Sequence, residues 1–313
     1  MTLTQSPHLE NDALEAAILS TVAYRDIFDF PMTLDEIHRY LHWQQCSVAD
    51  VAETLAKTEL CHGRLATDGR YYCLANREWT LDDRHVREAR AEQKMQVALR
   101  IARLLSHLPH IRMIAITGSL AARNCYEGSD IDFFCVTSEG RMWQARALVL
   151  VVARWDAMTR KRGICANYFA STRAIEFDNQ SMYIAQELSQ MVPVYGHDIY
   201  EQIRAQNGWT SRFLPNGSTP PMPRIDVSVH ARAKRAMEGL VAAFTGSWLE
   251  TFERTRKMRR FNDPSFMDGT HSPFTADRTG HDQRVGKRIE AAWQARFGAI
   301  RPQTAPDHPV ETR

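Results

Sequence analysis

Several features that direct a chain to a particular environment are missing from this sequence. The longest apolar run, residues 147–153, is too short to cross a bilayer. None of the six cysteines forms a Cys-x-x-Cys pair, so their spacing gives no indication of a zinc site. The first residues have neither the basic segment nor the apolar segment of a signal peptide. We therefore expect a reduced, cytoplasmic protein with no membrane-spanning segment.

The chain also lacks an excess of charge of either sign. Among its 313 residues, 39 Lys and Arg stand against 37 Asp and Glu, for a formal net charge of +2. Proteins bind long nucleic acids chiefly by neutralising phosphates, so this balance does not favour such a partner, without excluding it. The hydrophobic content of 44% is that of an ordinary globular protein, and the length predicts one or two domains.

What the sequence does contain is a pair of acids that follows a Gly-Ser turn. An apolar segment that predicts a strand ends at Gly118 and Ser119, and a second predicted strand, residues 130–136, begins with Asp130 and Asp132. Residues i and i+2 of a strand project to one face, about 7 Å apart along the backbone. Two neighbouring carboxylates repel each other unless a cation lies between them, and a hard divalent ion such as Mg²⁺ is the usual partner.

The Gly118-Ser119 turn adds a second kind of chemistry. A glycine leaves backbone N–H groups uncovered at the end of the strand, and such groups suit a phosphate. Without the acids downstream, Gly118 and Ser119 would be interpreted as an ordinary strand-to-helix turn with a capping serine. Together with the downstream acids, it indicates phosphoryl or nucleotidyl chemistry.

This arrangement resembles the signature of the nucleotidyltransferase superfamily typified by DNA polymerase β. That family has a Gly-Ser or Gly-Gly, a spacer of this length and an Asp-x-Asp between apolar residues, often with a serine before the first Asp. The resemblance covers residues 95–195 and implies one or two bound Mg²⁺ ions, or Mn²⁺ in their place. The residues that it implies for catalysis and metal binding are Asp130 and Asp132, and those for nucleotide binding are Gly118, Ser119 and Ser129.

The resemblance also implies a reaction. A nucleoside triphosphate, expected to be ATP, would place its phosphates on the Gly118-Ser119 turn, and an acceptor hydroxyl would attack the α-phosphate and release pyrophosphate. The modest net charge favours the hydroxyl of a small molecule or of a protein as acceptor. Arg123, on a helix predicted over residues 120–126, could either contact a phosphate or be an exposed helix charge.

The sequence departs from the family at a third carboxylate. The two-metal reaction needs an acid from a later strand, but the predicted strand at residues 163–170 contains none, and Asn167 stands at the expected place. Glu176, in the next segment, is the other possible third position. An enzyme with two acids therefore competes with a non-catalytic regulator that has a degenerate nucleotidyltransferase site and that senses a nucleotide or binds DNA. A glycosyltransferase also uses Asp-x-Asp, but without the preceding Gly-Ser.

The segment before this region carries three helical patterns and a hairpin. Thr33 and Ser47 are the expected N-caps of the second and third helices, and the turn at Asp68-Gly69 joins two short strands. This order resembles a winged helix. Its third helix has two acids and one lysine, so we expect a packing or interaction module and not a DNA reader.

We expect an α+β protein whose central domain has a small mixed β-sheet flanked by helices. The predicted parts are a winged-helix-like module (11–78), the nucleotidyltransferase domain (79–215), a C-terminal helical region (216–300) and a disordered tail (301–313). Within them, one long helix is predicted over residues 81–108 and another over residues 229–261. A helix over residues 141–161 is expected to bury Leu148, Val151, Val152 and Trp155.

Overall fold

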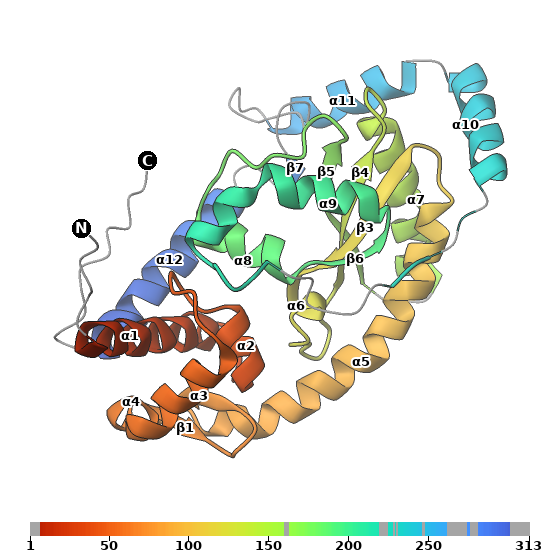
Figure 1. Ribbon diagram of the computed structural model, residues 1–313. Helices are drawn as coiled ribbons and strands as arrows, with labels where there is room; N and C mark the ends of the chain where they lie inside the picture. The colour runs from red at the N-terminus through yellow and green to blue at the C-terminus, as the bar shows by residue number, and fades with distance from the viewer. Residues whose placement is uncertain are drawn as a thin grey trace, which may run out of the picture.

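The computed structural model describes residues 7–159, 163–218, 225–227, 229, 231–245, 248–261, 274–275 and 281–300. Within these residues the protein is a mixed α+β structure around a five-stranded sheet with the order β6–β3–β4–β5–β7 (Figure 1). The strands are β3 (Ile111–Thr117), β4 (Ile131–Thr137), β5 (Ile164–Ser171), β6 (Val192–Tyr195) and β7 (Phe274–Thr275). The tail that we predict to be disordered lies outside the described residues.

The sheet is mixed, as predicted. Strand β3 runs antiparallel to β4 and β6, whereas β4 and β5 are parallel. Ile116 pairs with Phe133 on one face, and Ala115 pairs with Phe134 on the other; all four are buried. Both faces of the sheet are therefore covered, which explains why its strands are continuous apolar runs.

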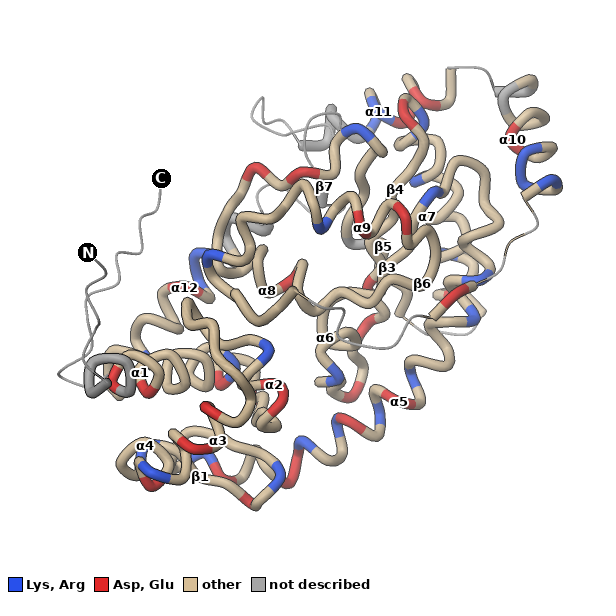
Figure 2. Tube along the Cα trace, viewed as in Figure 1, with Lys and Arg blue, Asp and Glu red and all other residues tan. Residues whose placement is uncertain are grey.

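Helices from separate parts of the chain cover the two faces. One face packs against α5 (Trp79–Ser106), α6 (Gly118–Ala121) and α7 (Met142–Thr159). The other packs against α8 (Met182–Gln190), α9 (His197–Gln206) and the 3-10 turn η1 (Gly208–Arg212), together with residues of the first and last helices. The long helix α5 carries interspersed acids and bases, and it connects the N-terminal elements to β3 (Figures 1 and 2).

The N-terminal elements agree with the predicted order of helices and hairpin. They are α1 (Pro7–Asp26), α2 (Leu34–Arg39), α3 (Val48–Lys57), the short turn α4 (Glu59–Gly63), β1 (Leu65–Thr67) and β2 (Tyr72–Leu74). The predicted N-caps are confirmed, because Thr33 and Ser47 each form a capping box. The Asp68 carboxylate accepts two backbone N–H groups in the predicted turn between β1 and β2.

The C-terminal helices lie on different sides of the molecule. They are α10 (Ala231–Thr245), α11 (Trp248–Phe261) and α12 (His281–Ile300), so the helix predicted over residues 229–261 is present as two helices. Helix α11 packs on α7, whereas α12 packs on α1 and α8. Trp293 of α12 is buried and donates its indole N–H to the Ser20 carbonyl at 3.2 Å. Residues 216–300 are therefore consecutive in sequence but are not one packing unit.

Two further predictions are corrected. Helix α7 buries Trp143, Ala145 and Val149 against the sheet, while Val151 and Trp155 are 64% and 47% exposed. The middle of this helix is apolar all round, so its sequence could not select the buried face. The helix predicted over residues 120–126 ends at Ala121, because the backbone turns left-handed at Arg123 (φ 57°). In the described part of the chain, every helix is too short or too polar to span a bilayer.

Candidate functional site

The two predicted acids lie at the amino end of β4. Asp130 is exposed and Asp132 is half-buried. Asp132 pairs in register with Thr117 of β3 on one side and with Cys165 of β5 on the other. Partners in register project to the same face, so these three side chains form a row across the sheet.

Two glycines bring backbone directly against the carboxylates. Gly118 has φ +64°, and a Cβ atom at that position would lie 2.5 Å from Oδ2 of Asp132. Gly163 has φ +66°, and its Cβ would clash with Oδ1 of Asp130. Both positions have a left-handed backbone, which favours glycine, and at both a side chain would force the facing carboxylate to move. Gly118 of the predicted turn therefore lies against Asp132, whereas the glycine that lies against Asp130 is Gly163.

The environment of Asp132 disfavours a negative charge in the absence of a cation. The pKa of this carboxyl is raised to about 6, chiefly by burial and also by the neighbouring Asp130, while a hydrogen bond with Cys165 and the charge of Lys94 act in the opposite direction. The hydroxyl of Thr117, which is 3% exposed, has no hydrogen-bond partner among the described residues. Two carboxylates, an unpaired hydroxyl and a close backbone turn are donors that fit a hard cation such as Mg²⁺ or Mn²⁺.

Lys94 is a site residue that the sequence analysis missed. It lies on α5, and its ammonium group donates a hydrogen bond to the carbonyl of Ser129, directly before the acids. Its charge also lowers the pKa of Asp132. No local signal identifies this lysine, because only the packing of α5 against the sheet brings it to the site.

The nucleotide-binding residues implied by the resemblance have varied surroundings. The Ser119 hydroxyl forms a hydrogen bond with the Cys125 thiol. The Ser129 hydroxyl accepts the N–H of Tyr126 at 2.8 Å and so closes the turn before β4. Arg123 lies 3.5 and 3.4 Å from carboxylate oxygens of two α5 residues, Glu88 and Glu92. Of the two alternatives for Arg123, the structure favours a surface charge, which here is paired.

The residue next to Asp132 on β5, where a third metal-binding carboxylate would lie, differs from the one predicted. Cys165, and not Asn167, is the register partner of Asp132. Asn167 is the extra residue of a β-bulge, between the partners of Phe133 and Phe134, and its side chain lies outside the described part. Among the described residues, no group of three or more His, Cys, Asp or Glu side chains is placed to hold a metal ion.

Glu176 is not brought to the acid pair. It follows the carboxyl end of β5, whereas the acids lie at the amino end of β4, and these two strands are parallel. Six residues separate Cys165 from Ser171 at the end of β5, which corresponds to about 20 Å. The chain then turns back, since the Phe177 ring lies 6.1 Å from the Phe134 ring, but among the described residues Glu176 forms no metal-binding group with the two acids.

The loop between the turn and the acids is fixed to the N-terminal elements by two buried arginines of α5. Arg84 donates to the carbonyls of Pro31 and Arg123 at 3.1 and 2.8 Å. Arg87 donates to the Asp29 carbonyl at 2.5 Å and to the Tyr126 hydroxyl at 3.1 Å. The segment between α1 and α2 thus supports the loop that carries the candidate site.

Comparisons with protein-family models, with curated proteins and with solved structures found no match for this chain. Function is therefore argued from the geometry of the site. That geometry comprises Asp132 on β4, Asp130 directly before the strand, Gly118 packed against Asp132, and Lys94 close enough to influence Asp132.

Proposed function

We propose that this protein is a Mg²⁺-dependent nucleotidyltransferase. It would transfer a nucleoside monophosphate from a triphosphate, ATP in the first instance, to the hydroxyl of a small molecule or a protein. The observation that carries the proposal is the contact between the left-handed Gly118 backbone and the Asp132 carboxylate, with Asp130 directly before the strand that carries Asp132. This contact joins a turn suited to phosphate with a pair of acids suited to a divalent cation.

The residues of the chain would divide the work as follows. Asp130 and Asp132 would hold the cation, with Mn²⁺ able to replace Mg²⁺. When bound, the cation supplies positive charge to the triphosphate and acidifies the acceptor hydroxyl. Gly118 and Ser119 would face the phosphates, and Lys94 holds the Ser129 carbonyl and adds positive charge next to Asp132.

The N-terminal elements support a winged-helix-like module in a packing role. Besides the β1–β2 hairpin, Met32 forms a β-bridge with Tyr72, which adds a third extended segment. The single lysine of α3, Lys57, is paired with Glu53 on the same helix. A helix with so little free positive charge is a poor ligand for a phosphate backbone. Instead, the module would brace the loop of the active site.

A second function is favoured by the position of Cys165. A thiol beside Asp132 replaces the carboxylate that the two-metal reaction uses, so the domain could bind a metal-nucleotide without transferring it. The protein would then be a nucleotide-sensing or DNA-binding regulator. Both proposals predict binding at the acid pair, and only the first predicts transfer.

Calorimetry and a transfer assay separate these functions. ATP, GTP, CTP and UTP are titrated in the presence of Mg²⁺, and at least one should bind to the native protein but not to Asp130→Asn or Asp132→Asn. Glu176→Gln is the matched control, because this acid is exposed and, among the described residues, forms no metal-binding group with the pair. If no triphosphate binds, or if the control loses binding equally, the site assignment is wrong.

The transfer assay supplies a triphosphate labelled at the α-phosphate together with a cell extract. Incorporation of the label that depends on Mg²⁺ and on Asp132 supports the enzyme. Binding without transfer for all four nucleotides supports the regulator.

A further inference from the structure

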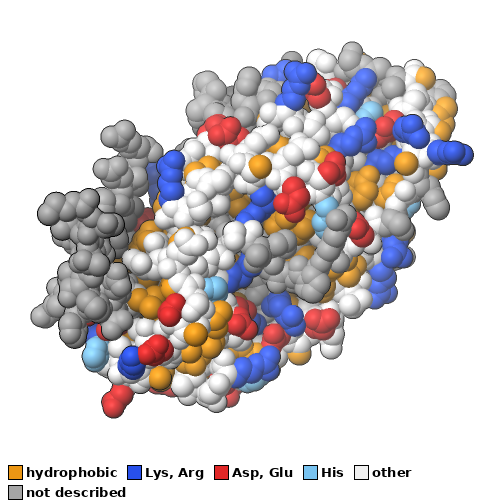
Figure 3. Space-filling view, viewed as in Figure 1, with side chains coloured by type: hydrophobic (Ala, Val, Ile, Leu, Met, Phe, Trp, Pro, Cys, Tyr) orange, Lys and Arg blue, Asp and Glu red, His pale blue; other side chains and the backbone are white. Residues whose placement is uncertain are grey.

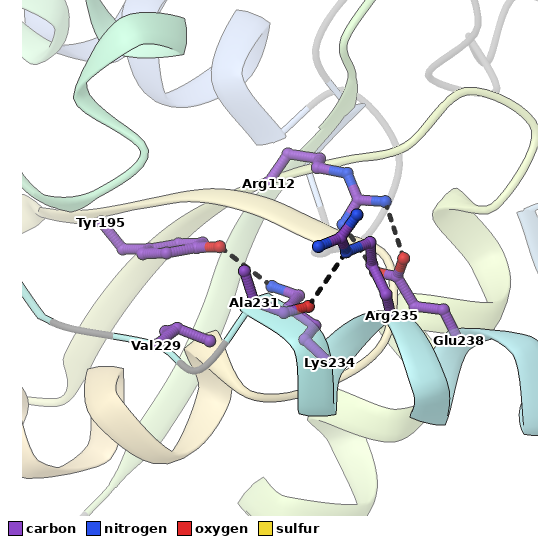
Figure 4. Close-up of a pocket in the computed structure, with 7 residues that line it drawn as sticks. All are labelled: Arg112, Tyr195, Val229, Ala231, Lys234, Arg235 and Glu238. Atoms are coloured by element: carbon purple, nitrogen blue, oxygen red, sulfur yellow. Dashed lines mark hydrogen bonds and ion pairs between the residues drawn. The ribbon is translucent and has the colours of Figure 1, made fainter.

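A cavity of 320 Å³ lies at the other end of β3 from the acid pair. It is formed where β3 begins, where β6 ends and where α10 begins (Figure 4). The distance along β3 from Arg112 to Thr117 is five residues, or about 17 Å, so the cavity is separate from the candidate active site. The residues that line it are Arg112, Tyr195, Val229, Ala231, Lys234, Arg235 and Glu238.

Three cationic side chains and one acid line the cavity, and that acid, Glu238, is already paired with Arg112. Glu238 receives two hydrogen bonds from Arg112, at 2.6 and 3.1 Å, and one from the backbone N–H of His110 at 2.9 Å. Arg235 contacts only the Ala231 carbonyl of its own helix among the described residues. The positive charges of Lys234 and Arg235 are therefore not matched by a carboxylate at this place.

Lys234 is a buried positive charge with a fixed geometry. It is 5% exposed and donates to the carbonyls of Ser106 and Ile111 at 2.7 and 2.5 Å, and to the Tyr195 hydroxyl oxygen at 3.2 Å. Its pKa is lowered to about 8, chiefly by burial and also by the Arg112 charge, while Glu238 acts in the opposite direction. Because the Tyr195 oxygen accepts from Lys234, its own proton is available to a group in the cavity (Figure 4).

The start of α10 increases this excess of positive charge. Arg232, Lys234 and Arg235 lie at or near its first turn, which contains no acid. The tube carries the Lys and Arg colour at this end of the helix, and the space-filling view shows Lys and Arg side chains on the same side of the molecule (Figures 2 and 3). Cations at a helix start are unfavourable because that end of the helix carries partial positive charge, and an anion there would offset all of these charges.

We propose that this cavity binds a phosphate group, as inorganic phosphate or as the phosphomonoester of a small molecule. The Arg235 guanidinium and the Tyr195 hydroxyl donate to the phosphate oxygens, while Lys234 and Arg112 supply fixed positive charge. The volume exceeds that of a phosphate ion, which is of the order of 100 Å³, so the cavity leaves room for part of an organic group. This binding does not depend on the nucleotidyltransferase proposal.

Calorimetric titration with inorganic phosphate and with ribose 5-phosphate tests the proposal. EDTA is present throughout, so that no divalent cation can bring phosphate to the acid pair. We expect a dissociation constant of about 1 mM or tighter for at least one ligand. Arg235→Gln should weaken binding by about 10-fold or more, and Tyr195→Phe should weaken it several-fold, because each removes a donor to a charged group.

The matched control is Arg232→Gln, on the same turn of α10 but not part of the cavity lining. It should leave the affinity within about twofold, as should Asp132→Asn at the distant site. Tighter binding of inorganic phosphate identifies the free anion as the ligand, and tighter binding of ribose 5-phosphate identifies a phosphomonoester. The proposal fails if neither binds at about 20 mM, if Arg232→Gln weakens binding as much as Arg235→Gln, or if Asp132→Asn abolishes it.

Discussion

Replacing Gly118 by alanine tests the contact on which the proposed function depends. The substitution introduces a Cβ atom 2.5 Å from Oδ2 of Asp132, at a backbone φ of +64°. Two costs follow: an L-residue in a left-handed conformation, and a displaced carboxylate. Gly128, in the same loop, has φ +76° and no atom within 4 Å of its would-be Cβ. Gly128→Ala therefore carries only the first cost and is the matched control.

The magnitudes follow from these two contacts. A left-handed conformation costs an L-residue about 1–2 kcal/mol, so both variants should lose about this much stability. In Gly118→Ala, the carboxylate must also move by about 0.9 Å to restore an ordinary contact of 3.4 Å. A carboxylate can rotate away at small cost, so the additional loss of stability should stay below about 1 kcal/mol. Its effect on a ligand that needs the original carboxylate position should be larger, about 10- to 100-fold in affinity.

The assay has two parts. Urea denaturation in EDTA measures the free energy of unfolding of both variants and of the native protein. Calorimetry with Mn²⁺, and then with ATP and Mg²⁺, measures the affinity of the acid pair. We expect both variants to unfold at lower urea concentrations, and only Gly118→Ala to bind Mn²⁺ and ATP more weakly.

Two results would refute this reasoning. If Gly118→Ala and Gly128→Ala bind Mn²⁺ and ATP equally well, the contact between the turn and Asp132 has no part in ligand binding. If Gly128→Ala is the more damaging variant for binding, the ligand uses the tip of the loop and not the Gly-Ser turn.

Three further predictions concern the acid pair, the third position and a buried histidine. Asp132→Asn removes a desolvated charge, so in EDTA it should raise the free energy of unfolding by about 1 kcal/mol. The same variant should weaken Mn²⁺ binding at least 10-fold. A lower free energy of unfolding in EDTA would contradict this prediction. Cys165→Asp should raise the Mg²⁺ affinity measured by calorimetry more than Asn167→Asp does, because Cys165 is the register partner of Asp132. The opposite order of affinities would show that the bulge residue, Asn167, is the third ligand. Burial, with the nearby Arg25 charge, lowers the pKa of His42 to about 3 from an unfolded value of about 6.5. The unfolded chain therefore binds more protons between these pKa values, so His42 should make stability fall with decreasing pH by up to about 1.4 kcal/mol per pH unit. His42→Gln should flatten this slope in urea denaturation from pH 6 to pH 4, and an unchanged slope would show that His42 is not the titrating group.

Structure set by local signals was predicted well. The strand before Gly118 and the strand that carries Asp132 are apolar runs with clear boundaries, and the structure has them at residues 111–117 and 131–137. The N-caps at Thr33 and Ser47 depend on contacts within four residues, so the sequence contains all that they need. Even the left-handed turn at Gly118 could be expected from the residue type.

Features that depend on long-range packing were not predicted. The bulge in β5 shifts the register so that Cys165, and not Asn167, lies beside Asp132. Lys94 reaches the site only because α5 packs against the sheet, 35 residues before the carbonyl of Ser129 that it contacts. Similarly, the buried face of α7 is selected by the sheet and α11, because the helix itself is apolar on more than one side.

The sequence by itself determined that Asp132 lies at the start of a strand next to a glycine turn, with Asp130 directly before it, because apolar runs and a turn glycine are local properties of the chain. Only the tertiary structure decided what surrounds them. The segment after β5 brings no acid into a metal-binding group with them among the described residues, register placed a thiol at the third position, and helix packing supplied the lysine. It also assembled the basic cavity from β3, β6 and α10, which are distant in sequence. These contacts arise when the apolar faces of helices and strands are buried against one another. Which faces are buried depends on all the packed elements together and not on any one segment.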